Sequence, residues 1–352
     1  MRSKFIVAAP ICILALGLAG CGGSTGGAGS NATSDLDCSS PETFCVGLVT
    51  DGGKVDDKSF NQAAWGGVQR ARDTLGAHVR YIETTDAKDY TANIKQFTDQ
   101  KYDAVVTVGF LMTDPTAAAA AQNPGTKFIG VDEMIDTEKV KSPNLTGLTF
   151  PADQAGYAVG YLAGLLTKTG KIGAINGLEI PPVQKYFKGY EAGAKASNPN
   201  VQVVGVYHPA SGQPFNDPVW GAGEAKKQLA QGVDVIFGIG SNTGNGALNE
   251  VAKSSDAGTT RFCIGVDVDQ WSTLPEARPC MVTSAEKLIA DGVAELLGQA
   301  EDGTMKSGNF MGKTGISQFH DFDSKIPAEV KTKVEQVVKK LADGSLQTNV
   351  VL

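Results

Sequence analysis

The stretch "YDAVVTVGF" (residues 102–110) is a short apolar run that ends in glycine and phenylalanine, and its pattern returns later in the chain. Residues 233–240, "VDVIFGIG", repeat it, and "FIGVDE" (128–133) is repeated in the same way by "FCIGVDVDQ" (262–270). Both repeats keep the same order, at an offset of about 131 to 135 residues. Two copies of one open α/β lobe are the simplest explanation. The alternative is a coincidence of composition, since buried parallel strands resemble one another.

Other apolar runs of the same kind occur along the chain, each short and rich in β-branched residues. The full set is "FCVGLVT" (44–50), "DAVVTVGF" (103–110), "KFIGVDE" (127–133), "KIGAING" (171–177), "VQVVGVYH" (201–208), "VDVIFGIG" (233–240) and "RFCIGVD" (261–267). Segments of about ten to twenty residues with a helical pattern separate these runs. This alternation predicts βαβ units, with parallel sheets that are covered by helices on both faces.

The N-terminus has the parts of a bacterial export signal. Two basic residues are followed by a run of apolar residues and then by "LAGC" (18–21), which resembles a lipobox. The apolar run is too short to span a bilayer as a helix. We therefore expect residues 1–20 to be a lipoprotein signal peptide, with lipid attached to Cys21 and residues 21–43 acting as a flexible tether. An ordinary secreted protein with a chance cysteine is the alternative.

Six cysteines occur in the chain, and four of them lie beyond the lipobox. Outside the cytoplasm such cysteines can pair as disulfides. Their order suggests the pairs Cys38–Cys45 and Cys263–Cys280, each closing a short loop, and free buried thiols are the alternative. No CxxC spacing indicates a zinc site, and we expect neither a metal nor a cofactor.

The formal net charge of the 352-residue chain is −7. Removal of residues 1–20 leaves 29 of the 31 basic side chains against 38 acidic ones. This acidic balance argues against a surface for nucleic acid or anionic lipid. No further segment is long and apolar enough to cross a membrane. The remaining part, about 330 residues, exceeds one typical core and predicts two lobes.

Polar and aromatic residues stand at the ends of the predicted strands, where ligands bind in open α/β sheets. These residues are Asp51, Phe110, Asp132, Asn176, Ser241, Asn242 and Asp267. They come from both halves of the chain, so they line one cleft if the two lobes face each other. The loop within "VTDGGKVDDKSFNQAAWGG" (49–67) adds Phe60 and Asn61, while Asp56 and Asp57 suit the start of the following helix.

Three patterns that could carry catalysis or a metal are weak. An S-x-x-K at 284–287 precedes S-G-N (307–309) and K-T-G (313–315), the residue order of penicillin-binding enzymes, but the set spans only about 30 residues. The glycine cluster "GIGSNTGNG" (238–246) lacks the G-x-G-x-x-G spacing, and the aspartates of the 49–67 loop lack the EF-hand pattern. Carboxylates, an aromatic face and an amide instead predict recognition of a polar ring with hydroxyl groups, without turnover.

The segment "VGLVTDGGKVDDKSFNQAAWGGV" (46–68) resembles the signature of the basic membrane protein family, the Med/PnrA-like substrate-binding lipoproteins of bacterial ABC transporters. The resemblance covers essentially all of the chain from about residue 44. Further matching segments are "VVTVGFLMTD" (105–114), "FIGVDE" (128–133), "GYLAG" (160–164), "IPPVQKYFKGYEAG" (180–193), "TGNG" (243–246), "IGVDVDQ" (264–270), "TSAEK" (283–287) and "FHDFDSKIPAEV" (319–330).

The resemblance implies a type I periplasmic-binding-protein fold, with two Rossmann-like lobes joined by a hinge of three crossings. The crossings are expected near 148–152, 270–282 and 315–320. The N-terminal lobe is then made of 44–150 plus 282–315, and the C-terminal lobe of 151–281 plus 316–352.

The resemblance also implies a purine nucleoside ligand of the guanosine, adenosine or inosine type. By resemblance, Phe60 stacks on the base, while Asn61 and Asp51 contact its edge. Asp267 takes the ribose hydroxyls, with Lys287 and Asp132 nearby. The remaining expected residues are Gly240, in the glycine-rich turn, and a second aromatic from the other lobe, for which Phe237 is the first choice and Phe187 the second.

The implied role is capture of the ligand outside the cytoplasm, at the cell membrane through the lipid anchor, by a monomer that delivers it to an ABC permease and its ATPase. A sugar or another small polar ligand on the same fold is one alternative, and a surface sensor without transport is another. An enzyme such as a nucleoside hydrolase would need aspartates clustered around Ca²⁺, a pattern that this sequence does not have.

Overall fold

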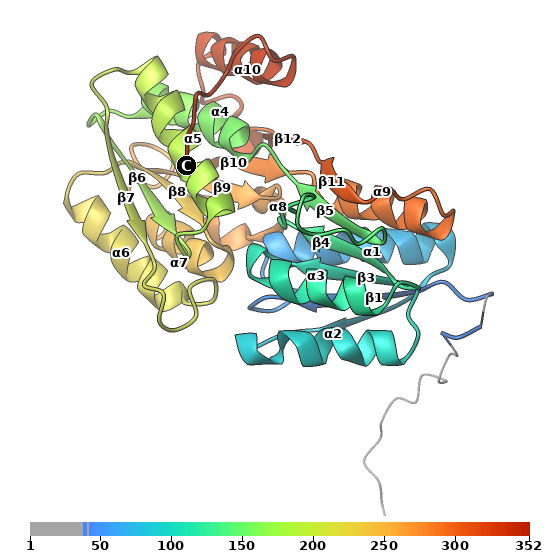
Figure 1. The fold of residues 1–352 in the computed structure, drawn as a ribbon. Coiled ribbons are helices and arrows are strands. Elements are labelled where there is room, and N and C mark those ends of the chain that lie inside the picture. Colours follow the sequence, from blue (N-terminus) through green and yellow to red (C-terminus); the bar gives the residue numbers. More distant parts are fainter. Residues whose placement is uncertain (1–37, 41) are drawn as a thin grey trace, which may run out of the picture. The chain divides into compact units, whose positions relative to one another are not determined.

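The computed structural model describes residues 38–40 and 42–352. The expected signal peptide, Cys21 and most of the expected tether lie outside these residues. Within the described part, the chain forms two six-stranded sheets, each with helices packed on it (Figure 1).

The first sheet is parallel throughout, with the strand order β11-β5-β4-β3-β1-β2. Its strands are β1 (Cys45–Thr50), β2 (His78–Ile82), β3 (Ala104–Val108), β4 (Lys127–Val131), β5 (Leu145–Thr149) and β11 (Gly308–Met311). Every residue of β1, β3 and β5 is buried, as expected for strands that are covered on both faces. The edge strands β2 and β11, by contrast, contain exposed residues.

The second sheet has the order β12-β10-β9-β8-β6-β7. Its strands are β6 (Lys171–Asn176), β7 (Gln202–Tyr207), β8 (Val235–Ile239), β9 (Phe262–Asp267), β10 (Met281–Lys287) and β12 (Thr314–Ile316). All neighbours pair in parallel except β10 and β12, which are antiparallel.

The two sheets share one strand order, since β7-β6-β8-β9-β10 repeats β2-β1-β3-β4-β5. The echoed stretches of sequence therefore occupy equivalent strands, β3 with β8 and β4 with β9. All seven strands predicted from apolar runs are confirmed. The predictions missed β2, β5, β10, β11 and β12, which are polar, short or at an edge and so lack a long β-branched run.

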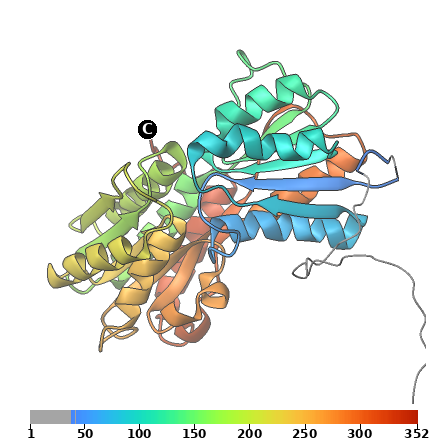
Figure 2. The ribbon, with the colours of Figure 1, turned by 90° about the horizontal axis from the view of Figure 1, so that it is seen from below.

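Helices cover both faces of the first sheet. On one face, α1 (Phe60–Leu75) and α9 (Ile289–Glu301) pack over the sheet, and on the other lie α2 (Tyr90–Asp99) and α3 (Thr113–Gln122). Figure 2 shows the strands as a layer between the blue helix α1 and the teal helices α2 and α3. The short 3-10 segments Ala87–Asp89 and Phe110–Met112 precede α2 and α3.

The second sheet is covered in the same way. One face carries α4 (Ala152–Leu166), α5 (Pro181–Ser197) and α10 (Ala328–Ala342), and the other carries α6 (Pro218–Ala230) and α7 (Ser241–Ala252). The remaining elements are the short helix α8 (Gln270–Thr273) and the 3-10 segments Pro275–Ala277 and His320–Phe322.

Helices α4 and α5 pack backbone against backbone. A Cβ atom on Gly160 would lie 2.1 Å from the carbonyl oxygen of Tyr190, and one on Gly193 would lie 2.0 Å from that of Tyr157. No other residue type fits at such distances. The glycines of the family-like stretches "GYLAG" and "KGYEAG" therefore serve helix packing and not ligand contact.

The chain passes between the two sheets three times. The first passage follows β5 at 150–151, within the expected 148–152. The second comes after β10, at Leu288, and the third between β11 and β12, at 312–313, instead of at 270–282 and 315–320.

Residues 282–287 and 314–315 therefore belong to the second sheet, although the sequence analysis assigned them to the first lobe. The reason is that β10 is a buried strand paired with β9, and the chain can leave the sheet only when that pairing ends. The three passages lie side by side, since the amide of Leu288 donates to Lys313 O at 2.9 Å and that of Gly312 to Thr149 O at 2.8 Å.

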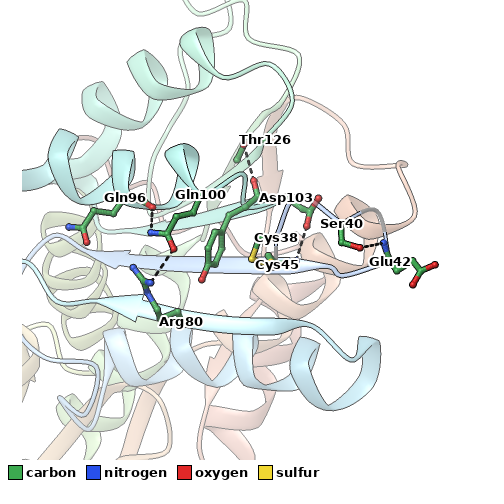
Figure 3. The surroundings of a disulfide bond; sticks show 10 residues. Cys38, Ser40, Glu42, Cys45, Arg80, Gln96, Gln100, Asp103 and Thr126 are labelled. Carbon is green, nitrogen blue, oxygen red and sulfur yellow. Dashed lines mark hydrogen bonds between the residues drawn. A yellow bond between two sulfur atoms is a disulfide. The ribbon is translucent and has the colours of Figure 1, made fainter. Parts of the chain in front are cut away.

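Two disulfides join Cys38 to Cys45 and Cys263 to Cys280, the pairs suggested by sequence order. The first holds the start of the described chain on β1, and the amide of Cys45 donates to Asp103 Oδ2 at 2.7 Å (Figure 3). None of the helices in this described part is long and apolar enough to span a membrane.

Candidate functional site

A pocket lies between the two lobes at the carboxyl ends of their strands. Nine residues expected from the sequence line it, five from the first lobe and four from the second. They are Asp51, Phe60, Asn61, Phe110, Asp132, Gly240, Ser241, Asp267 and Lys287, whereas the expected Asn176 and Asn242 do not line it.

Phe237, the expected second aromatic, does not line the pocket. Its side chain is fully buried in the core beneath α5, with its ring centroid 5.3 Å from that of Tyr190. The second choice, Phe187, is also a core residue, and its ring lies 5.9 Å from that of Tyr207. Phe237 sits inside strand β8, and only residues at the end of that strand, beginning with Ile239, reach the pocket.

Two aromatic side chains of the second lobe line the pocket without having been expected there: Tyr186 of α5, and Phe215 in the loop 208–217 that follows β7. A Cβ atom on Gly177 would lie 2.5 Å from the ring of Phe215, so the glycine makes room for this phenylalanine. His208 Nε2 lies 3.3 Å from Asp217 Oδ2 and closes the base of the loop. The strand-end rule, applied to the run 201–208 as well, would have directed attention to this loop.

The start of α1 places Phe60 and Asn61 at the pocket. The carboxylate of Asp57 accepts hydrogen bonds from the amides of Ser59, Asn61 and Gln62 at 2.9–3.1 Å, so it satisfies amides that the helix itself leaves unpaired. Asn61 Nδ2 donates to Gly52 O at 2.8 Å. Its buried Oδ1 has no partner among the described residues, which leaves one acceptor for a ligand.

Lys287 joins carboxylates from both lobes. Its Nζ pairs with Asp132 Oδ2 and lies 4.0 Å from Asp267 Oδ1, with all three side chains buried. The ammonium group also lies 5.4 Å from the ring centre of Phe60 and 5.0 Å from that of Tyr186, which favours a cation–π interaction. Among the described residues that line the pocket, this lysine is the only cation, and it lies next to two acceptors of hydrogen bonds.

The carboxyl groups of the pocket differ in proton affinity. Burial raises the pKa of Asp51 to about 8, and the nearby carboxylates of Asp132 and Asp57 add to the effect. Burial also raises the pKa of Asp267, but only to about 6, because Lys287 favours its charged form. At neutral pH, Asp51 is therefore mainly protonated and can donate a hydrogen bond, whereas Asp267 is mainly ionised and accepts.

Hydrogen bonds between the two lobes hold them together beside the pocket. Ser59 Oγ donates to Asp267 Oδ2 at 2.9 Å, and Asn245 Nδ2 donates to Asp57 O at 2.8 Å. Gln270 Nε2 orients Asn245 by donating to its Oδ1 at 2.7 Å. We call these five residues the interlobe latch. Because each bond to Ser59 or Asp57 joins the two lobes, the latch stabilises the closed arrangement.

Over residues 38–40 and 42–352, no three His, Cys, Asp or Glu side chains are grouped to hold a metal ion. The pocket offers aromatic faces, carboxyl groups and an amide, and it offers them from both lobes. Such a set can surround a polar ring that carries hydroxyl groups.

The model of the Bmp family, described as "ABC transporter substrate-binding protein PnrA-like", matches residues 44–341. A Listeria monocytogenes protein named "CD4+ T-cell-stimulating antigen" is 32% identical over 99% of both chains. A Lactococcus lactis protein named "ABC transporter nucleoside-binding protein BmpA" is 34% identical over 63% of both chains. A solved ABC transporter solute-binding protein from Aeropyrum pernix superimposes with a TM-score of 0.77 at 23% identity, covering 86% of this chain and 92% of that one.

The strand order, the pocket between two lobes and these matches lead to one conclusion: the chain has the type I periplasmic-binding-protein fold and belongs to the Bmp family of PnrA-like ABC transporter substrate-binding proteins.

Proposed function

We propose that this protein is a lipid-anchored, extracytoplasmic binding protein that captures a purine nucleoside and delivers it to an ABC importer. The observation that carries the proposal is the composition of the pocket, which places Phe60 and Phe215 from opposite lobes together with a buried carboxylate and an unpaired amide oxygen.

The two phenylalanines suit a flat heterocycle. Stacking of a base on an aromatic side chain contributes about 1–3 kcal/mol. Asn61 Oδ1 accepts from a donor on the base edge, while Asp51, mainly protonated at neutral pH, donates to an acceptor there. A purine edge carries both kinds of group, so the two side chains recognise the base by complementary hydrogen bonds.

The ionised carboxylate of Asp267 suits vicinal hydroxyl groups such as those of a ribose. Hydrogen bonds to a charged group contribute about 1.5–3 kcal/mol each. Lys287 keeps this carboxylate ionised and lies next to Asp132, so a second carboxylate is available to the sugar.

Binding and closure are coupled in this proposal. A ligand that contacts residues of both lobes stabilises the arrangement in which the lobes meet. The interlobe latch adds contacts that form only in that arrangement. The closed form is then the one that docks on the permease.

The anchoring part of the proposal rests on the sequence. Residues 1–20 form the signal peptide, Cys21 carries the lipid and residues 21–43 are the tether. The name of the Lactococcus lactis relative supports a nucleoside as the ligand. The family supports permease and ATPase subunits as partners, since it consists of ABC transporter substrate-binding proteins.

The test is isothermal titration of the purified protein with guanosine, adenosine, inosine, ribose, free bases and hexoses. We expect a nucleoside to bind and ribose alone to bind far more weakly. If sugars bind and no nucleoside does, the alternative of a sugar-binding protein is favoured. The carboxylates at the strand ends support this alternative, because they can accept hydrogen bonds from sugar hydroxyl groups. Co-purification with a permease distinguishes transport from a surface sensor.

A further inference from the structure

A second, larger cavity adjoins the pocket. Its volume is about 320 Å³, compared with about 50 Å³ for the pocket itself. The two spaces share three lining residues, Asp51, Gly52 and Phe215. We call the larger space the outer cavity.

The walls of the outer cavity come from both lobes and combine apolar surface with a few polar side chains. The first lobe contributes the loop from Gly52 to Lys54 and the segment around Thr85 and Tyr90, and the second contributes residues 210 and 212–216. A Cβ atom on Gly52 would meet no atom within 4 Å, so this part of the boundary between the two spaces is open. The mainly apolar lining, which includes Leu111, Leu178 and Phe215, suits a hydrocarbon substituent.

The shared residues fix which end of a ligand faces the outer cavity. Asn61, the amide expected at the base edge, donates to Gly52 O, so it lies beside the boundary. Asp267 and Lys287, expected at the sugar, line the pocket but not the outer cavity. A nucleoside held in this orientation directs the edge of its base, and not its ribose, toward the larger space.

We propose that the site accepts purine nucleosides with a substituent on the base edge, and that the outer cavity holds the substituent. This inference rests on the proposed function, since it uses the same orientation of the ligand. The chemical class is a nucleoside with an alkyl, aralkyl or acyl group on an exocyclic nitrogen.

Titration of the full-length protein in detergent micelles tests the inference. The probes are adenosine with its N6-methyl, N6-butyl and N6-benzyl derivatives, and guanosine with the matching N2 derivatives. In at least one series, we expect the Kd of the bulky derivatives to stay within about tenfold of that of the parent nucleoside. If the Kd of the bulky derivatives rises more than about a hundredfold in both series while the parent nucleosides still bind, the inference is overturned and the proposed function stands. If no nucleoside binds, both fall.

Variants that fill the outer cavity provide the second test. Gln213 and Ala87 line the outer cavity from opposite lobes and do not line the pocket. We expect Gln213→Trp or Ala87→Trp to raise the Kd of the bulky derivatives at least about tenfold and to leave the Kd of the parent nucleoside unchanged. The matched control is Val219→Trp, on a side chain of the second lobe that is 82% exposed. Equal effects on bulky and parent nucleosides, or no effect of either variant, would contradict the inference.

Discussion

Asp132 and Asp267 occupy equivalent positions at the ends of β4 and β9, and the amine of one residue, Lys287, pairs with both. Both aspartates have a left-handed backbone, with φ of 60° and 65°, which is uncommon for a residue with a side chain and is found at functional sites. Because Lys287 directly precedes the passage at Leu288, this triad joins the two lobes next to the hinge.

The first prediction concerns Asp267. We expect Asp267→Ala to weaken nucleoside binding by about 10²–10⁴-fold, because two hydrogen bonds to a charged acceptor are lost. The circular dichroism spectrum should stay native. Isothermal titration measures the effect, with the exposed Asp302→Asn as control. An unchanged Kd would exclude Asp267 as the group that binds the ribose.

Phe60 and Phe215, from opposite lobes, should act as a pair. Phe60→Ala and Phe215→Ala are each expected to weaken binding by about 10- to 100-fold, since each removes a stacking partner worth about 1–3 kcal/mol. By contrast, Phe237→Leu should lower the free energy of unfolding and leave the Kd nearly unchanged, because Phe237 is a core residue. Titration and urea unfolding separate the two effects. If Phe237→Leu loses binding while the variant is still fully folded, the assignment of Phe237 to the core and not to the site is contradicted.

Removal of the lysine should destabilise the fold. We expect Lys287→Met to lower the free energy of unfolding by about 3–5 kcal/mol, because it leaves buried carboxylates without their cation. The double variant Lys287→Met/Asp132→Asn should recover part of this loss, since one of the unpaired charges is also removed. Urea unfolding of the ligand-free protein measures both. A double variant no more stable than the single one would show that the pairing with Asp132 has no energetic role.

The stability of the ligand-free protein should fall as the pH rises. The pKa of Asp51 is about 8 in the folded protein against an ordinary value of 3.8, so between these values the folded state holds a proton that the unfolded chain has released. Asp267 lowers the stability with rising pH in the same way, between pH 3.8 and about pH 6. We expect the Tm to decrease from about pH 5 to about pH 8, and to decrease less in Asp51→Asn. Equal slopes for the wild type, Asp51→Asn and the control Asp302→Asn would refute this origin.

The interlobe latch should hold the lobes together without ligand. Asn245→Leu removes the hydrogen bond to Asp57 O and the acceptor of Gln270, and net contributions of such bonds are about 0.5–1.5 kcal/mol each. We expect a larger radius of gyration by small-angle scattering in the ligand-free state, and a smaller difference once ligand is bound. The exposed Asn200→Leu serves as control. Identical scattering of the ligand-free wild type and Asn245→Leu would exclude a role of the latch in closure.

Much of the fold and of the site could be predicted from the sequence. The apolar runs identify seven strands, and the residues at or directly after the ends of five of them (Asp51, Gly109, Asp132, Gly240 and Asp267) line the pocket, because the carboxyl ends of parallel strands meet at one edge. The same rule leads to the loop after β7 but not to Phe215 itself, since this residue lies in the middle of a loop whose path depends on contacts with Gly177 and, through the amide of Asp217, with Thr243. The expectation for Phe237 is wrong because its apolar run predicts the strand correctly but does not show that the residue lies two positions before the strand end that reaches the pocket.

The sequence by itself determined the features that depend on local chemistry: buried strands, export signal, cysteine order and the family-like loop at 46–68. Only the tertiary structure decided where the chain changes lobes, because β10 stays in the second sheet through its pairing with β9 until Lys287. It also decided which aromatic side chains of the second lobe line the pocket together with Phe60, and how Lys287 meets two aspartates 135 residues apart in the chain. Such contacts depend on the packing of distant segments, and no local pattern of residues encodes them.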